Sequence, residues 1–318
     1  METITRRNFM KLTGGAGAGL FFASPIKGMS FPVERLFKIS LNPFAIGVNL
    51  DQEELLKAAL KYGFEAILPI PVQLAEMGAD QRNHFMSEMK ANKLTWDAAG
   101  LPVDFRKDDD LFKEGMASLP HLAEALEKCG VKRMSTWMMP THQELTYLEN
   151  FKRHASRLKE VTNVLQDYDI KLGLEYVGPK TLTSMHKYPF ISSMKEAFEL
   201  IHEINVPNLG IQLDSFHWYC AEETISDIES LTNEQIVTCD LNDATAGRTA
   251  AEQIDGEREL PGDSGVIDLS GFLQALVKIG YNGPVRAEPF NAKLNNMDNG
   301  QALAATAKAM KATVAKIE

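Results

Sequence analysis

Four acidic residues in the second half of the sequence each close, or nearly close, a short apolar run. Such runs, rich in aliphatic residues, are typical of buried strands. Carboxylates that converge from neighbouring strand ends in a low-dielectric site repel one another unless a cation neutralises them. Oxygen-only ligand sets suit hard divalent ions, and no histidine or cysteine is an obvious ligand here. The sequence therefore predicts a divalent metal site, with manganese or magnesium favoured and cobalt or zinc as alternatives. The predicted ligands are Glu175, Asp214, Asp240 and Glu288.

An alternation of short apolar runs with longer segments of helical periodicity starts near residue 44 and continues to the C-terminus. This pattern is typical of strand–helix units around a parallel sheet. Eight such units predict an α/β fold, a single (β/α)8 TIM barrel over residues 44–318. Because the chemistry of such a barrel lies at the carboxyl ends of its strands, we expect the four acids at one mouth. The predicted strands are 44–50, 65–72, 93–98, 131–138, 170–177, 209–216, 236–241 and 284–290. The clearest predicted helices are 51–62, 111–129, 144–166, 192–204, 270–279 and 300–316.

Five further side chains near the predicted strand ends are candidates for binding a substrate. His217 lies three residues past the sixth-strand acid, where it could face the substrate or support a metal ligand from behind. Trp218 could stack on a sugar face or pack in the core. Arg248 and Arg258, after the seventh strand, could bind hydroxyls or a carboxylate, or lie in an exposed loop. His142, just past the fourth strand, could line the mouth or lie on the surface.

The first 25 residues have the layout of an export signal. Arg6 and Arg7 stand two residues before a phenylalanine and precede an uncharged stretch, 12–25, rich in Gly and Ala. This order is similar to the twin-arginine export signal of bacteria. We therefore expect a signal peptide over residues 1–25 and a linker over 26–43. The expected location is the periplasm, or the outer side of the membrane if the signal is retained as an anchor. An accidental basic N-terminus on a cytosolic protein is the alternative.

Composition and charge exclude several classes of protein. The 318 residues are 44% hydrophobic and 24% charged, which is ordinary globular usage. With 33 Lys and Arg against 43 Asp and Glu, the net charge of -10 opposes binding to a phosphate backbone, so no nucleic-acid partner is expected. Three cysteines without CxxC spacing indicate neither a disulfide framework nor a cysteine zinc site. Beyond the N-terminus no apolar run is long enough to span a bilayer, and homo-oligomer formation is left open.

Distinctive short segments accompany the predicted fifth to eighth strands. They are Gly-Leu-Glu-Tyr-Val-Gly-Pro (173–179), Leu-Asp-Ser-Phe-His-Trp (213–218), Leu-Asn-Asp-Ala (241–244), and the stretches 258–263, 265–268, 280–284 and 288–290. Taken in order, they resemble the xylose-isomerase-like barrel superfamily, in its sugar phosphate isomerase/epimerase branch. The resemblance implies that Glu175, Asp214, the seventh-strand position and Glu288 hold a metal ion. That superfamily usually has His-x-x-Asp at the seventh strand, and here Asp240 stands in place of the histidine. The change shifts the site toward harder ions and is also one route to a non-catalytic relative.

Moving a proton between adjacent carbons of a sugar needs a base near the C–H bond and a charge sink for the enediolate oxygen. The predicted function is a divalent-metal-dependent sugar isomerase or epimerase, with Glu175 and Glu288 as proton acceptor and donor and His217 assisting. Because phosphorylated intermediates are normally kept inside the cell, we expect a small carbohydrate substrate, either a free sugar or a sugar derivative. Two alternatives remain: a lyase that acts by β-elimination on 3-keto glycosides, and a non-catalytic exported sugar-binding protein.

Overall fold

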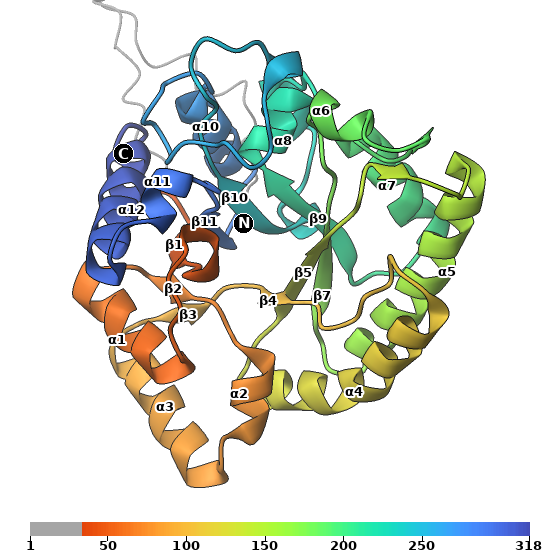
Figure 1. Ribbon diagram of the computed structural model, residues 1–318. Helices are drawn as coiled ribbons and strands as arrows, with labels where there is room; N and C mark the ends of the chain where they lie inside the picture. The colour runs from red at the N-terminus through yellow and green to blue at the C-terminus, as the bar shows by residue number, and fades with distance from the viewer. Residues whose placement is uncertain (1–33) are drawn as a thin grey trace, which may run out of the picture. The chain divides into compact units, whose positions relative to one another are not determined.

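Nine short segments pair in parallel into one sheet in the computed structural model, which describes residues 34–318 (Figure 1). The order of the segments across the sheet is β3-β2-β1-β11-β10-β9-β7-β5-β4. Only Asp97 and Ala98 separate β3 from β4 in the chain, so these two ends of the order form one interrupted strand and the sheet closes on itself. The segments are β1 (Lys38–Leu41), β2 (Ala66–Ile67), β3 (Thr95–Trp96), β4 (Ala99–Gly100), β5 (Arg133–Trp137), β7 (Lys171–Glu175), β9 (Leu209–Asp214), β10 (Ile236–Leu241) and β11 (Pro284–Ala287). The predicted (β/α)8 TIM barrel is thereby confirmed.

Helices follow the strands and surround the barrel (Figure 1). Several begin where the sequence offers a capping group. At the start of α1 (Gln52–Tyr62), Asp51 accepts a hydrogen bond from the backbone N–H of Glu54, and the Glu54 side chain accepts one from the backbone N–H of Asp51. Gly63, with a φ of 69°, then ends this helix in the left-handed conformation that glycine favours. All six of the clearest predicted helices are present. The longer helices are α1 (Gln52–Tyr62), α3 (Ala79–Ala91), α4 (Asp109–Lys128), α5 (Tyr147–Gln166), α7 (Met194–Ile204), α10 (Leu269–Lys278) and α12 (Asn299–Val314). The shorter ones are α2 (Pro71–Glu76), α6 (Lys180–Thr183), α8 (Ser215–Cys220), α9 (Ile225–Glu229) and α11 (Ala292–Asn295).

A small antiparallel ribbon pairs β6 (Thr141–His142) with β8 (Tyr188–Pro189) outside the barrel sheet. It joins the loop after β5 to the loop after β7. The ribbon therefore lies at the carboxyl ends of the strands, the end at which the sequence predicts the chemistry.

The prediction for the first strand is wrong. Residues 44–50 contain a short 3-10 helix, Phe44–Ile46, that follows Pro43 and ends at Gly47, which has a φ of 72°. The first strand is instead β1, which pairs with β2 and β11. Ala45, Ile46 and Val48 are buried, so the apolar run reflects burial and not strand geometry. The barrel therefore begins within the segment that was assigned to a linker.

The predicted signal peptide lies outside the described residues, as does the first part of the predicted linker. Within residues 34–318, no helix combines the length and the apolar character needed to cross a membrane.

A buried histidine in α5 predicts how stability changes with pH. His154 is 2% exposed, and burial lowers its pKa to about 3, well below its value in an unfolded chain. Below about pH 6.5 the unfolded chain therefore binds a proton that the folded chain does not, and stability falls as the pH falls toward 3. We expect this group to remove about 2 kcal/mol of folding free energy between pH 7.5 and pH 5.

Urea unfolding of wild type and His154→Phe at pH 7.5 and pH 5 measures this contribution. The phenylalanine keeps an aromatic ring against Phe105 and Phe190. We expect the variant to lose about 2 kcal/mol less than wild type on acidification. Equal losses in the two proteins would contradict the assignment.

Candidate active site and metal-binding cluster

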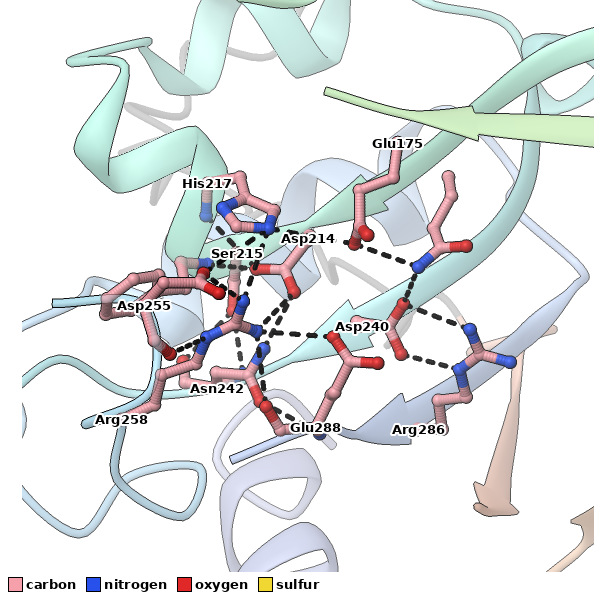
Figure 2. A network of polar contacts seen from close by, with 12 residues as sticks. Glu175, Asp214, Ser215, His217, Asp240, Asn242, Asp255, Arg258, Arg286 and Glu288 are labelled. Atoms are coloured by element: carbon pink, nitrogen blue, oxygen red, sulfur yellow. Dashed lines mark hydrogen bonds and ion pairs between the residues drawn. The ribbon is translucent and has the colours of Figure 1, made fainter. Parts of the chain in front are cut away.

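The four predicted metal ligands meet at the carboxyl ends of adjacent strands. Glu175 is the last residue of β7 and Asp214 the last of β9, while Asp240 lies near the end of β10 and Glu288 directly follows β11. These strands are neighbours in the sheet. Each of the four side chains offers a carboxylate oxygen, and these oxygens all lie within 4.8 Å of one another. Figure 2 shows the cluster.

Asp214 is held in place by its own helix and by two side chains. Its Oδ1 accepts hydrogen bonds from the backbone N–H groups of Phe216 and His217, at 2.6 and 3.1 Å, and so caps α8. Its Oδ2 accepts from Asn242 at 2.9 Å and from Arg258 at 3.0 Å. Four hydrogen-bond donors thus hold this carboxylate in a fixed position in the cluster.

Arg258, which is 1% exposed, reaches into the cluster from the loop after β10. Its Nη1 donates to Asp214 and, at 3.3 Å, to Glu288 Oε2, while its Nη2 donates to Asp255 at 2.6 Å. The rings of Phe216 and Phe290 lie 4.8 and 4.5 Å from the guanidinium carbon. These contacts place the guanidinium among three carboxylates (Figure 2) and raise the pKa of Arg258, so it stays charged.

Asp240 is paired with a second buried arginine. Arg286 Nε lies 2.6 Å from Asp240 Oδ1 and its Nη2 lies 3.3 Å from Oδ2. Gln212 donates to Asp240 Oδ2 at 2.6 Å and to Glu175 Oε1 at 2.9 Å. Arg286 also approaches Asp97 at 3.5 Å, deeper in the barrel. Asp240, which stands in place of the expected histidine, is therefore one half of a buried ion pair. Arg286 competes with any metal ion for its two carboxylate oxygens.

Burial and mutual repulsion make the carboxylates hard to ionise together. Burial, and then the charges of Glu288, Asp214 and Asp240, raise the pKa of Glu175 well above its usual value. Burial and the charge of Asp240 raise the pKa of Glu288 to about 8. Burial raises the pKa of Asp240 to about 6, although Arg286 lowers it. The two arginines therefore do not balance the negative charge of the cluster.

The donor set fits a divalent cation. No described residue donates a hydrogen bond to Glu175 Oε2 or Glu288 Oε1, so these oxygens are open. The excess negative charge is what a bound cation would offset. Glu175 and Asp214 also form a second candidate set with His217, within the same 4.8 Å. A histidine ligand, which the sequence did not indicate, is thus within reach and would widen the choice of metal toward zinc.

His217 lies in the first turn of α8, 2% exposed. Its Nε2 accepts from Arg258 Nη2 at 3.2 Å and lies 4.0 Å from Glu175 Oε1. Burial and the neighbouring arginine lower its pKa to about 3, so the ring is neutral. Its Nδ1 is buried and has no partner among the described residues. His217 can therefore exchange the contact of its Nε2 with Arg258 or with Glu175 for a contact with a substrate.

A cavity of about 380 Å³ opens beside the cluster, within the usual size range for small-molecule sites. Glu175, His217, Arg258 and Glu288 are polar members of its lining, and most of the other lining residues are apolar. A lining with both polar and apolar side chains suits a sugar ring, which has hydroxyl edges and C–H faces. The lining residues are Trp137, Met139, Glu175, Val177, Leu182, His217, Asp255, Arg258, Glu288 and Phe290.

Three of the predicted substrate-binding residues do not line this cavity. Trp218 is 6% exposed, packs edge-on against Phe272 and donates from Nε1 to the Thr224 carbonyl, which is the core-packing role left open for it. Arg248 pairs with Glu257 at 2.6 Å in the loop after β10. His142 lines a neighbouring cavity.

Sequence reasoning missed the side chains that lie one layer below the acids. Gln212 lies two residues before Asp214 on β9, and Arg286, on β11, lies two residues before Glu288. Alternate residues of a barrel strand face the same side, so this spacing was the available signal for both. Asp255, in the loop after β10, carried no comparable signal.

Comparison with known proteins agrees with this architecture. Residues 56–313 match the xylose isomerase-like TIM barrel family. The chain belongs to this family. Among curated members, it is 25% identical to the inosose isomerase of Bacillus subtilis over 210 residues, 66% of this chain and 72% of that protein. It is 25% identical to the ketose 3-epimerase of Arthrobacter globiformis over 195 residues, 61% of this chain and 59% of that protein.

Two solved structures superimpose well on this chain. A xylose isomerase domain protein from Alicyclobacillus acidocaldarius gives a TM-score of 0.77 at 25% identity, over 88% of this chain and 99% of the other. An IOLI protein solved with a binding zinc atom gives a TM-score of 0.73 at 22% identity, over 89% and 99%. The homologues thus include an inosose isomerase and a ketose 3-epimerase, and they support an enzyme of this superfamily.

Proposed function

We propose that this protein is a divalent-metal-dependent sugar isomerase or epimerase that moves a proton next to a carbonyl group. The observation that carries the proposal is that Glu175 and Glu288, from opposite edges of the carboxylate cluster, line one cavity together with Arg258 and His217. The inosose isomerase and ketose 3-epimerase relatives support this class of reaction.

Each polar residue of the cavity has a task in such a reaction. Glu175, with one open oxygen, accepts the proton from the carbon beside the carbonyl. Glu288 then returns a proton, to the adjacent carbon in an isomerisation or to the opposite face of the same carbon in an epimerisation. Arg258 donates hydrogen bonds to the oxygen that gains negative charge, and His217 holds a neighbouring hydroxyl. A divalent ion held by Glu175, Asp214, Glu288 and either Asp240 or His217 would supply a Lewis acid for that oxygen.

Removal of divalent metal is expected to stop proton transfer. Without a cation, burial and the charges of Glu288, Asp214 and Asp240 keep the pKa of Glu175 well above its usual value, so Glu175 is not a ready base at neutral pH. We expect chelation to lower solvent hydrogen exchange into the substrate at least 100-fold, an effect in the range of one acid–base group. NMR in D2O over a panel of free and 3-keto sugars measures it, and exchange that survives chelation would contradict the metal requirement.

Adding back single metals identifies the preferred ion. Manganese or magnesium should restore the exchange if the oxygen set binds the ion, whereas zinc or cobalt should restore it better if His217 is a ligand. The zinc atom in the IOLI structure makes zinc a necessary member of this series.

A lyase acting by β-elimination is the second candidate. The chain is 33% identical over 104 residues to the 3-dehydroshikimate dehydratase of Pseudomonas aeruginosa, a match that covers 32% of this chain and 16% of that protein. Elimination begins with the same proton abstraction beside a carbonyl and differs in the loss of a leaving group from the next carbon. Mass spectrometry of the products separates the two: an unchanged mass supports isomerisation, and loss of water or of an aglycone supports elimination.

We also propose that the protein is exported through its twin-arginine segment. The supporting observation is Arg6-Arg7 ahead of an uncharged stretch rich in Gly and Ala. Fractionation of bacterial cells that express the full chain should find it outside the cytoplasm, and replacing both arginines by lysine should retain it inside. Equal distributions of the two proteins would contradict export by this route.

A further inference from the structure

A second cavity, of about 470 Å³, adjoins the catalytic cavity. Trp137 and Met139, at and just after the end of β5, line both cavities, so the two meet at this pair. Trp137 is in register with Glu175 on the neighbouring strand, and the backbone N–H of Met138 donates to the Glu175 carbonyl at 2.9 Å. The wall between the cavities is therefore fixed directly to the strand that carries the proposed base.

Two residues that line the second cavity, Arg153 and His154, each carry a buried polar atom without a partner among the described residues. His154 Nδ1 lies 2.9 Å from the carbonyl of Asn150 and must donate to it, which leaves Nε2 as an acceptor. That Nε2 is buried and has no partner among the described residues, although the side chain is 2% exposed. Arg153 Nε, a donor, is also buried and has no partner among the described residues. Buried groups of this kind cost free energy until a ligand or water pairs with them.

His142 adds a donor to these two groups. Its Nδ1 accepts from the backbone N–H groups of Glu144 and Leu145, at 3.0 and 2.8 Å, so in the neutral ring Nε2 carries the proton. Burial and the charge of Arg153 lower the pKa of His142, which favours that neutral form. The lining residues thus carry both donors and acceptors, which suits a hydroxyl group, because a hydroxyl can donate one hydrogen bond and accept others.

Trp137 provides an aromatic surface where the two cavities meet. The side chain is 44% exposed, although the three residues before it in β5 are buried. Arg106 lies over the ring with its guanidinium carbon 4.3 Å from the ring centre, and donates to the Trp137 carbonyl at 2.9 Å. The ring is thereby held in position, and its uncovered surface is available to the C–H face of a sugar.

The charges around this cavity favour an uncharged occupant. Arg106 and Lys107 pair with Asp104 at 3.4 and 3.2 Å, and Glu144 adds a further negative charge to the lining. Arg153 is the cation left without an ion pair among the described residues, and its guanidinium is already donating to Asn150. An anion would find little net positive charge here, whereas a hydroxylated ring would find both hydrogen-bonding types and an aromatic surface.

We propose that the second cavity is a glycosyl subsite, so that the substrate is a glycoside or disaccharide whose reacting ring lies in the catalytic cavity and whose second ring lies against Trp137, Arg153 and His154. This inference rests on the proposed function for the identity of the reacting ring. The second ring itself requires only the lining of the second cavity.

Calorimetric titration of the Glu175→Gln protein tests the subsite without turnover. The probes are glucose, glucuronate, inorganic phosphate, and the glucose disaccharides maltose, cellobiose, laminaribiose and trehalose. We expect at least one disaccharide to bind ten times more tightly than glucose. Adding His154→Phe or Trp137→Ala should remove most of that advantage while changing the affinity for glucose less. Trp96→Phe, at a tryptophan on β3 whose ring stacks on Phe85, is the matched control and should keep the advantage.

Three results would overturn the subsite: no disaccharide binding better than glucose, no sugar in the panel binding at all, or the advantage persisting in both subsite variants. Tighter binding of glucuronate or phosphate than of any disaccharide would also overturn it, in favour of an anion site. The proposed function fails separately: disaccharide binding without solvent exchange in the wild-type protein removes the reaction and keeps the subsite. Solvent exchange into monosaccharides, together with no preference for binding disaccharides, removes the subsite and keeps the reaction.

Discussion

Replacing Glu175 by glutamine is expected to abolish proton transfer while the barrel stays folded. The amide cannot accept the proton, and it also weakens any bound cation because it lacks charge. Its shape is nearly that of the acid, and its oxygen can still accept from Gln212, which now lies 2.9 Å from Glu175 Oε1. Loss of one acid–base group lowers rates about 100- to 10,000-fold, and loss of metal would add to this.

Solvent exchange measured by NMR, together with metal content, checks the Glu175→Gln variant. Glu160→Gln, at an exposed glutamate of α5, makes the same chemical change away from the site and should keep wild-type exchange. An unaltered melting temperature in the Glu175 variant would assign the loss to chemistry. Exchange at near wild-type rates would remove Glu175 from the role of base.

Replacing Arg286 by methionine is expected to destabilise the fold strongly, because it leaves Asp240 buried without its main partner. Asp240 is fully buried, and Arg286 contacts both of its oxygens, at 2.6 and 3.3 Å. Breaking one side of a buried ion pair costs about 3–5 kcal/mol, since a lone buried charge must be desolvated or neutralised. Asp97 loses its contact with Arg286 as well.

A double variant distinguishes loss of the ion pair from loss of packing. Asp240→Asn added to Arg286→Met removes the uncompensated charge, so we expect it to recover a large part of the lost free energy of unfolding. Denaturant unfolding of chelator-treated protein is the measurement, because a bound cation would compensate for the missing arginine. A single variant as stable as wild type, or a double variant no better than the single, would contradict the ion-pair account.

The Asp240–Arg286 pair also affects the outcome of the substitution Asp240→His. A histidine at position 240 would leave Arg286 facing Asp97 alone in the barrel interior. Replacing Asp240 therefore changes the ion pair between β10 and β11 as well as one candidate metal ligand.

The local patterns of the sequence were enough to predict most of the fold. The helices were found because their apolar spacing and caps are local, as at Asp51 and Gly63 for α1. The first strand was missed because β1 has only four residues, and the longer apolar run after it is buried as a 3-10 helix. Periodicity reports burial, and burial does not by itself distinguish a short strand from a turn of helix.

The sequence by itself determined the barrel, its family, and the set of acids that would meet at its carboxyl end. This was possible because strand order in a (β/α)8 barrel follows chain order, so acids that end successive strands must become neighbours. Only the tertiary structure decided how those acids are balanced. Arg258 comes from a loop, whose path depends on packing, and Arg286 points into the barrel, where its partners Asp240 and Asp97 come from other strands. Charge balance in a buried cluster depends on three-dimensional distances between segments far apart in the chain, and no local pattern encodes those distances.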